Sequence, residues 1–206
     1  MKMSEIKAIV FDLGRVLVDV DITRGIFGLF GHSTTNGKEA AVAQMMREPI
    51  YAEYNAGKMT PERFYAAVNK KFSFEINFVE FARQWCDVFA PMDGMYELVK
   101  NLHGRVRIGL LSDTDPLHWK YICEQFAIVT LIDRPTLSFE TGFRKPAKEA
   151  YLSAVRNVGV VASQCLYIDD LMENVLGAMD AGLEAIQFTS ANALRQEMRI
   201  REIITS

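Results

Sequence analysis

Four separated stretches of the chain carry side chains that could serve one reaction. They are Asp12, Ser112 with Asp113, Lys145, and Asp169 with Asp170. Carboxylates gathered in one place repel one another, so a hard cation is their natural partner. Mg²⁺ fits best, because it takes one or two carboxylates together with waters and a phosphate oxygen. A hydroxyl and an ammonium group supply the donors and the positive charge that a phosphate needs. These residue types therefore favour phosphate chemistry beside a magnesium ion.

The elements that precede these residues must bring them together. Short apolar runs, typical of strands buried on both faces, lead into Asp12, Ser112 and Asp169. In parallel α/β sheets, ligands bind at the carboxyl ends of the strands, where the connecting loops converge. Taken alone, Asp12 could cap a turn, Lys145 could be a solvated loop residue, and the Asp169–Asp170 pair could cap a helix. Their shared place at strand ends and in a loop favours one joint site.

Strand and helix patterns alternate from Pro91 to the end of the chain. Strands are predicted over 106–111, 136–139, 165–168 and 184–188, with helices over 95–102, 117–126, 147–158 and from 191 onward. Another helix follows Asp170, with an expected apolar face made of Met172, Val175, Leu176 and Met179. This alternation predicts an α/β fold, a Rossmann-like parallel sheet with right-handed crossovers and helices on both faces.

Only helical patterns are visible between Asp21 and about Phe89. Thr60 and Pro61 mark one helix start, with Thr60 as N-cap and Pro61 at the first helical position. The first strand is thereby separated from the rest of its sheet. We therefore predict an α/β core formed by residues 1–18 and 90–206, with residues 19–89 inserted as a small all-helical unit.

Composition excludes several classes of function. The chain has 206 residues, of which 50% are apolar, and a formal net charge of −3, so no basic surface argues for nucleic acid or an anionic membrane. No apolar run approaches the ~20 residues of a membrane span, and the N-terminus does not read as a secretory signal. The cysteines, at positions 86, 123 and 165, are far apart and sit in apolar surroundings. We expect buried, reduced thiols in a cytoplasmic protein.

The order of the motifs resembles that of the haloacid dehalogenase superfamily, most of whose members are phosphatases, and of its subgroup with a helical cap inserted after the first motif. The motifs are Phe11-Asp12-Leu13-Gly14, Leu111-Ser112-Asp113-Thr114, Gly142-Phe143-Arg144-Lys145-Pro146, and Ile168-Asp169-Asp170 followed by Glu173, Asn174 and Gly177. Each is weak alone, but four in the family's order, spread over nearly the whole chain, are specific. The first and third look closest to a branch that includes sugar-phosphate phosphatases.

The resemblance implies the nucleophile and the metal ligands. Asp12 is expected to attack phosphorus and to form an aspartyl-phosphate. Mg²⁺ is expected to bind the Asp12 carboxylate, the backbone carbonyl of Gly14 and the acidic pair. Asp170 is favoured as the direct ligand, and Asp169 as a second ligand or a partner through water.

The resemblance also implies the phosphate contacts. Ser112 and nearby backbone N–H groups are expected to hold the phosphoryl oxygens, and Lys145 to neutralise the nucleophile and the phosphate. Asp113 stands where many relatives carry Asn, so its N–H alone is the expected contact. Arg15 replaces a smaller residue and could bind substrate or form a surface ion pair.

One departure from the family pattern bears on turnover. The residue two positions after the nucleophile is usually a second Asp, which acts as general acid and base, and here it is Gly14. General acid–base help is worth ~10²–10⁴-fold, so its loss predicts slow turnover or a preference for good leaving groups. Asp19 and Asp21 are near in sequence, but nothing in the sequence gives either of them this role.

These observations predict a Mg²⁺-dependent phosphatase acting on a small phosphorylated metabolite, with a sugar phosphate as one option. Two alternatives stay open. A haloacid dehalogenase would attack carbon with the same Asp and without a metal, although the acidic pair Asp169–Asp170 makes little sense without a cation. A non-catalytic phosphometabolite-binding protein would explain the loss of the second Asp. A monomer or weak dimer is expected, and His32, His103 and His118 are read as surface or packing residues with no zinc-site spacing.

Overall fold

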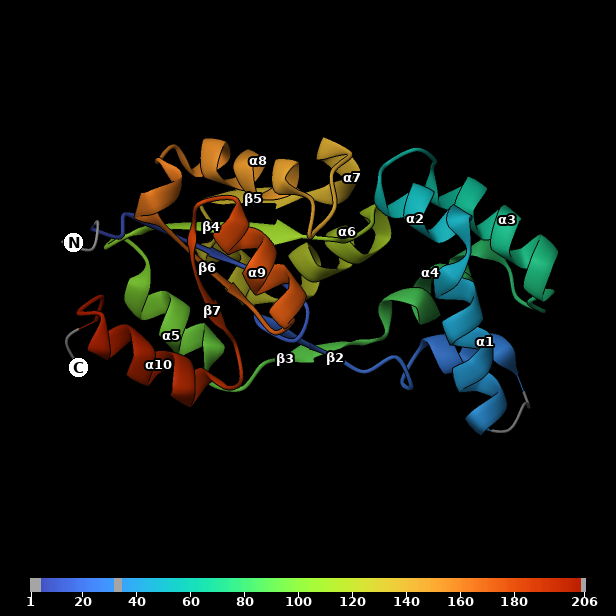
Figure 1. Ribbon diagram of the computed structural model, residues 1–206. Helices are drawn as coiled ribbons and strands as arrows, with labels where there is room; N and C mark the ends of the chain where they lie inside the picture. The colour runs from blue at the N-terminus through green and yellow to red at the C-terminus, as the bar shows by residue number, and fades with distance from the viewer. Residues whose placement is uncertain (1–4, 32–34, 205–206) are drawn as a thin grey trace.

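The computed structural model of the chain describes residues 5–31 and 35–204. Figure 1 shows a sheet flanked by helices, joined on one side to a separate group of helices. The sheet has five strands in the order β5-β4-β1-β6-β7, and all neighbouring pairs are parallel. The strands are β1 (Ala8–Phe11), β4 (Arg107–Ser112), β5 (Arg134–Leu137), β6 (Cys165–Asp169) and β7 (Glu184–Gln187). The predicted Rossmann-like α/β fold is confirmed.

The central strand β1 is buried on both faces, which explains its unbroken apolar sequence. Ala8 and Val10 belong to an apolar cluster with the helices α8 (Lys148–Val158) and α9 (Met172–Asp180). Ile9 and Phe11 point the other way, into a cluster with α5 (Met95–Leu102) and α10 (Ala191–Ile200). Helices therefore cover both faces, as the alternation of patterns predicts (Figure 1).

The end of β5 differs from the sequence-based prediction. The strand ends at Leu137, and Ser138 begins the short helix α7 (Ser138–Thr141) instead of extending the strand to Phe139. The Ser138 hydroxyl accepts a hydrogen bond from the Thr114 N–H and donates to the Asn55 carbonyl. Because these contacts lie outside the sheet, they turn the chain away from it. The remaining elements of this part are α6 (Pro116–Gln125), η2 (Ala127–Leu131) and η3 (Ala162–Gln164).

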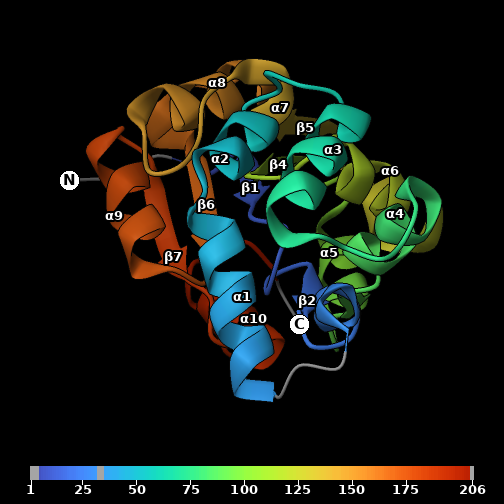
Figure 2. The ribbon, with the colours of Figure 1, turned by 90° about the vertical axis from the view of Figure 1, so that its right-hand side faces the viewer.

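The chain between β1 and β4 forms a helical segment on a two-stranded base. That base, an antiparallel pair of β2 (Val18–Val20) and β3 (Phe89–Pro91), was not predicted from the sequence. The segment contains η1 (Ile26–Phe30), α1 (Thr35–Arg47), α2 (Pro49–Asn55), α3 (Pro61–Phe72) and α4 (Phe78–Cys86). Thr60 caps α3 by accepting a hydrogen bond from Arg63 N–H, as the sequence predicts. Figure 2, turned to look at the segment, shows its helices lying over the strand ends of the sheet.

Aromatic packing holds the helical segment together. The Trp85 ring of α4 stacks on Phe81, with 5.6 Å between centroids, and meets the edges of Phe64 and Tyr51 at 5.2 and 6.2 Å. Tyr54 stacks on Phe64 at 4.2 Å. Three helices of the segment thus share one aromatic cluster, with Trp85 in contact with each of them.

Two sequence-based expectations are wrong in part. Cys86 and Cys165 are buried, but Cys123 is exposed on α6. On α9, Val175 is buried as expected. Met172, Leu176 and Met179 are about half exposed, because α9 turns Asn174, Val175 and Ala178 towards the sheet.

His32 lies outside the described residues. Among the helices that the structure describes, none combines the length and apolar composition needed to cross a membrane.

The helical segment touches the core closely at Gly57. This residue has φ +71°, and a Cβ placed on it would lie 1.9 Å from the Phe139 carbonyl oxygen. Gly104 has a similar φ of +81° but no atom within 4 Å of the corresponding position. Substituting each glycine in turn therefore separates the cost of a left-handed backbone, which both positions carry, from the cost of steric overlap, which only position 57 carries.

We predict that Gly57→Ala lowers the free energy of unfolding more than Gly104→Ala does. Both substitutions carry about 1–2 kcal/mol of left-handed strain, and Gly57→Ala adds about 1–3 kcal/mol of overpacking. Urea unfolding at constant m-value measures the difference. Equal losses in the two variants would contradict the close docking at Phe139.

Candidate active site

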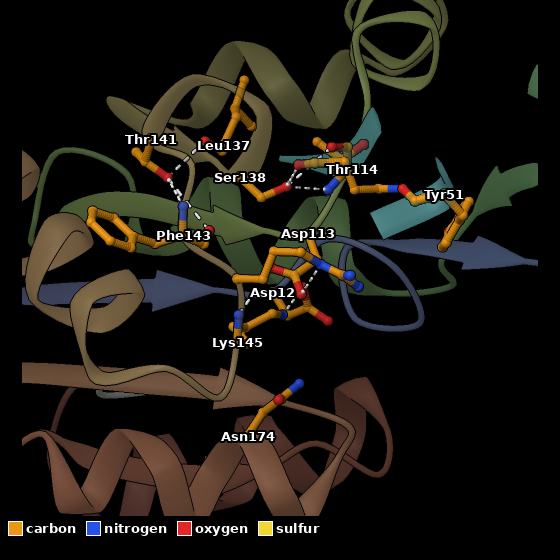
Figure 3. Close-up of polar contacts among 12 residues, drawn as sticks. Asp12, Tyr51, Asp113, Thr114, Leu137, Ser138, Thr141, Phe143, Lys145 and Asn174 are labelled. Carbon is orange, nitrogen blue, oxygen red and sulfur yellow. Dashed lines mark hydrogen bonds and ion pairs between the residues drawn. The ribbon is translucent and has the colours of Figure 1, made fainter. Parts of the chain in front are cut away.

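The functional side chains meet at the carboxyl edge of the sheet. The strands β4, β1 and β6 are neighbours, so Ser112, Asp12 and Asp169, which end or follow them, lie side by side. The Asp12 N–H continues the ladder by donating to the Ile168 carbonyl at 2.8 Å. Lys145 enters from the loop between α7 and α8, and Figure 3 shows it beside Asp12. The residues that the sequence places at strand ends and in this loop are brought together.

Lys145 is the centre of the charge arrangement. Its Nζ lies 2.6 Å from Asp12 Oδ1 and 2.9 Å from Asp169 Oδ2, and 4% of its side chain is exposed. Burial opposes the charged ammonium, but Asp12 and Asp169 outweigh it and raise the pKa of Lys145. Burial raises the pKa of Asp12 to about 6, with Asp169 adding to the effect and Lys145 opposing it. The ammonium therefore binds two carboxylates that would otherwise repel each other.

Both carboxylate oxygens of Asp169 accept hydrogen bonds from other residues of the protein. Its carboxylate accepts hydrogen bonds from the Tyr167 hydroxyl, the Leu171 N–H at 2.9 Å and the Asn174 amide at 3.0 and 3.1 Å, in addition to Lys145. Burial opposes ionisation, but Lys145 and these donors lower the pKa of Asp169. This side chain is a rigid, charged anchor for the site.

Asp170 is left with ligand capacity. No donor of another described residue bonds its carboxylate, which is partly exposed. Burial and the neighbouring Asp169 charge raise its pKa. One carboxylate oxygen from each of Asp12, Asp169 and Asp170 lies within 4.8 Å of the others. A set of hard oxygen donors with excess negative charge fits Mg²⁺.

Comparison with known proteins agrees with this geometry. Residues 6–182 match the model of the haloacid dehalogenase-like hydrolase family. The chain belongs to the haloacid dehalogenase-like hydrolases. Among its relatives, it is 24% identical over 202 residues to a D-ribitol-5-phosphate phosphatase of Bacteroides thetaiotaomicron, covering 95% of this chain and 98% of that protein.

Solved structures share the fold. A family enzyme of Bacteroides thetaiotaomicron, crystallised as a magnesium complex, superposes with a TM-score of 0.82 at 21% identity, over 95% of this chain and all of that one (100%). An L-2-haloacid dehalogenase superposes with a TM-score of 0.72 at 18% identity, over 95% and 100% of the two chains. The chain therefore shares its fold with a magnesium-bound family enzyme and with an L-2-haloacid dehalogenase.

Asp113 has a role in this hydrolase that sequence reasoning missed. Its Oδ1 accepts a hydrogen bond from the Lys145 N–H at 3.1 Å, and its Oδ2 lies 3.4 Å from Arg144 Nε. The carboxylate thus ties the loop of Lys145 to the end of β4, as Figure 3 shows. Ser112, which is 3% exposed, ends the same strand. Sequence reasoning expected only the Asp113 N–H to be used, and the sequence pattern did not indicate the contact of its carboxylate with the Lys145 loop.

Gly14 leaves no carboxylate at this position, and the nearest carboxylates in the sequence are Asp19 and Asp21. A Cβ on Gly14 would lie 3.2 Å from Val20 Cγ2. Asp19 accepts a hydrogen bond from the Val20 N–H, and Asp21 accepts two from Thr23. Both carboxylates are thus occupied by donors of neighbouring residues, Asp19 within β2 and Asp21 in the turn that follows it.

Arg15 adopts a left-handed φ of 59° and is exposed. It lines a cavity of about 490 Å³ together with Asp170 and Ser190, and its charge counteracts the raised pKa of Asp170. Arg15 therefore lies close enough to Asp170 for its charge to act on that carboxylate.

We predict that Asp170→Asn stabilises the metal-free protein at pH 7. The substitution removes one of three clustered carboxylates that face a single ammonium, and we expect a gain of about 1 kcal/mol in the free energy of unfolding. Urea unfolding in EDTA measures it. Asp19→Asn, at an exposed position of β2, is the matched control and should change stability by less than about 0.5 kcal/mol. A loss of stability in Asp170→Asn would show that the cluster is not electrostatically strained.

Proposed function

We propose that the protein is a Mg²⁺-dependent phosphatase that hydrolyses a small phosphorylated metabolite through an aspartyl-phosphate at Asp12. The observation that carries this proposal is the set of three carboxylates around one buried ammonium. Lys145 neutralises Asp12 and Asp169, and among the described residues no donor of another residue bonds the Asp170 carboxylate at the edge. A site that only attacked carbon would have no use for this excess of negative charge.

The metal would be held by Asp12, Asp170 and the backbone carbonyl of Gly14. Asp169, whose oxygens are already occupied by donors, would orient the site and contact a metal-bound water. This division keeps Asp170 as the direct ligand. Bound Mg²⁺ would act as a Lewis acid on a phosphoryl oxygen and offset the negative charge of the transferred group.

The chain's own residues would carry the transfer. A carboxylate oxygen of Asp12 forms the new bond to phosphorus as the bond to the leaving oxygen breaks, and water later cleaves the acyl phosphate to regenerate Asp12. Ser112 and nearby N–H groups would hold phosphoryl oxygens. Lys145 would keep the nucleophile ionised in spite of its burial and pair with the phosphate. Asp113 would keep Lys145 in place by holding its N–H.

We also propose that residues 1–18 and 90–206 form the catalytic core and that residues 19–89 form a cap that covers the site and selects the substrate. The D-ribitol-5-phosphate phosphatase matches this chain over nearly its full length, which supports a sugar or polyol phosphate as substrate. Arg15, beside the acidic cluster, is the candidate contact to the part of the substrate beyond the phosphate. The expectation of a cytoplasmic monomer or weak dimer stays a prediction.

A phosphometabolite-binding protein without turnover is the second candidate, and Gly14 is the observation that favours it. No carboxylate stands where the family's general acid is usual. Multiple turnovers on any member of a panel of sugar phosphates and nucleotides would exclude this candidate. Loss of turnover in EDTA would exclude the metal-free dehalogenase mechanism.

We predict that Asp12→Asn abolishes phosphate release from p-nitrophenyl phosphate, because the amide cannot form the acyl phosphate. Activity should fall by more than about 10³-fold. EDTA should remove the wild-type activity, and added Mg²⁺ should restore it. Asp19→Asn, which changes an exposed carboxylate of the nearby strand β2, should retain wild-type rates. Retained activity in Asp12→Asn would refute the nucleophile assignment.

A further inference from the structure

A buried polar cluster joins the helical segment to the core between α4 and α6. Asp115 has no exposed surface and caps α6, accepting the N–H groups of Leu117 and His118 at 2.9 and 3.0 Å. Its other oxygen accepts the indole N–H of Trp85 at 3.0 Å and lies 2.9 Å from His118 Nδ1. The Asp115 carboxylate of the core is thus hydrogen-bonded directly to Trp85, the central residue of the segment's aromatic cluster.

Both ring nitrogens of His118 face acceptors. Nδ1 lies 2.9 Å from the Asp115 carboxylate, and Nε2 lies 2.9 Å from the Trp85 carbonyl oxygen. Neither an ionised carboxylate nor a carbonyl can donate a proton, so both contacts are hydrogen bonds only when the imidazole carries two protons. The Trp85 carbonyl lies in the last turn of α4, where carbonyls lack helical partners and a cation is favoured.

The surroundings of His118 support a cation. Its ring lies parallel to the Trp85 indole at 5.2 Å between centroids, and Phe89 of β3 meets it edge-on at 4.9 Å. The neighbouring titratable groups of the segment, Tyr54 and Cys86, stay neutral, because burial first and the Asp115 charge second raise their pKa values. The Asp115 carboxylate is therefore the negative charge that lies against the His118 imidazole.

The direction of the titration follows from these contacts. Burial opposes the imidazolium, but Asp115 and the Trp85 carbonyl outweigh it and raise the pKa of His118 above its ordinary value. A raised pKa means that the contact is fully present below about pH 6.5 and is lost as the pH rises through the raised pKa. The connection between segment and core is thus strongest between the lowered pKa of Asp115 and the raised pKa of His118, and it weakens as the pH rises through the latter.

We propose that Asp115 and His118 are positioning residues of the phosphatase, which hold the cap against the loop of Ser112 and Asp113 while His118 is doubly protonated. Asp115 lies in the same loop as Ser112 and Asp113, and Trp85 touches the helices α2 and α3 as well as its own. Neither residue reaches the acidic cluster, so both act through the placement of the cap. This proposal rests on the function proposed above.

The protonation of His118 can be measured without activity. In ¹⁵N-labelled protein, the imidazole signals of three histidines are followed against pH, and His118 is assigned by its absence in His118→Gln. We expect both ring nitrogens protonated at low pH and a midpoint above about 6.5. A neutral single tautomer at pH 6, or a midpoint at or below the ordinary value, would overturn the proposal. Should His118→Gln not fold, Trp85→Phe, which deletes the indole N–H and shortens the ring that stacks on His118, assigns the signal by its shift.

The positioning role is measured by kinetics with p-nitrophenyl phosphate. We expect the wild-type KM to rise as the pH passes the His118 midpoint, with a smaller change in kcat. In His118→Gln, KM should be about tenfold higher at pH 6 and should no longer follow that midpoint. His103→Gln, an exposed histidine at the far edge of the sheet, is the matched control. A wild-type KM and pH profile in His118→Gln would overturn the positioning role. Absence of phosphatase activity in every variant would instead refute the proposed function and leave the imidazole titration to decide the protonation of His118.

Discussion

The arrangement of the site depends on one interaction, the contact of the Lys145 ammonium with carboxylates from two different strands. Like charges about 4 Å apart repel by about 4 kcal/mol at the effective dielectric of a protein site. Asp12 and Asp169 can lie together because Lys145 sits between them at 2.6 and 2.9 Å. The parallel sheet brings the two carboxylates close, and the loop of Lys145 must then be held in place. Asp113 does this through the Lys145 N–H.

The two adjacent acidic residues at the end of β6, Asp169 and Asp170, differ in how many hydrogen bonds the protein donates to them. Asp169 is bonded by Tyr167, Asn174 and a backbone N–H, so the protein satisfies its charge internally. Asp170, the next residue, has no such donors and lies at the open edge of the cluster. The Lys145 ammonium contacts only Asp12 and Asp169, so the Asp170 carboxylate is balanced only through the more distant charges of Arg15 and Lys145. Such a distribution suits a site that binds a cation from solvent, because the fixed members set its position and the free member supplies ligand capacity.

Sequence reasoning reached the sheet and the acidic cluster because both follow from local rules. An apolar run with a polar residue at its end locates a buried strand, and the parallel order of strands makes their ends converge. The tether formed by Asp113 depends on a loop, and the contacts of His118 depend on helix α4, which only folding brings next to α6. The β2–β3 pair has strands of three residues, too short for any periodicity to be visible. On α9 the apolar pattern is wide enough to fit more than one face, so sequence alone assigned Met172, Leu176 and Met179 to the wrong side.

The surroundings of Gly14 leave little room for a larger side chain at this motif position. The family's second Asp would need room for its side chain, and here a Cβ at position 14 would already lie 3.2 Å from Val20 Cγ2. The β2 strand that carries Val20 also begins the helical segment, so this methyl group belongs to the base of that segment. The two nearby carboxylates, Asp19 and Asp21, are bound to their own backbone. The missing proton donor is therefore not replaced from the β1–β2 connection. Under the proposed phosphoryl transfer, the charge on the leaving oxygen would be met by the cation, by the substrate or by solvent, and substrates whose leaving groups need little protonation would be favoured.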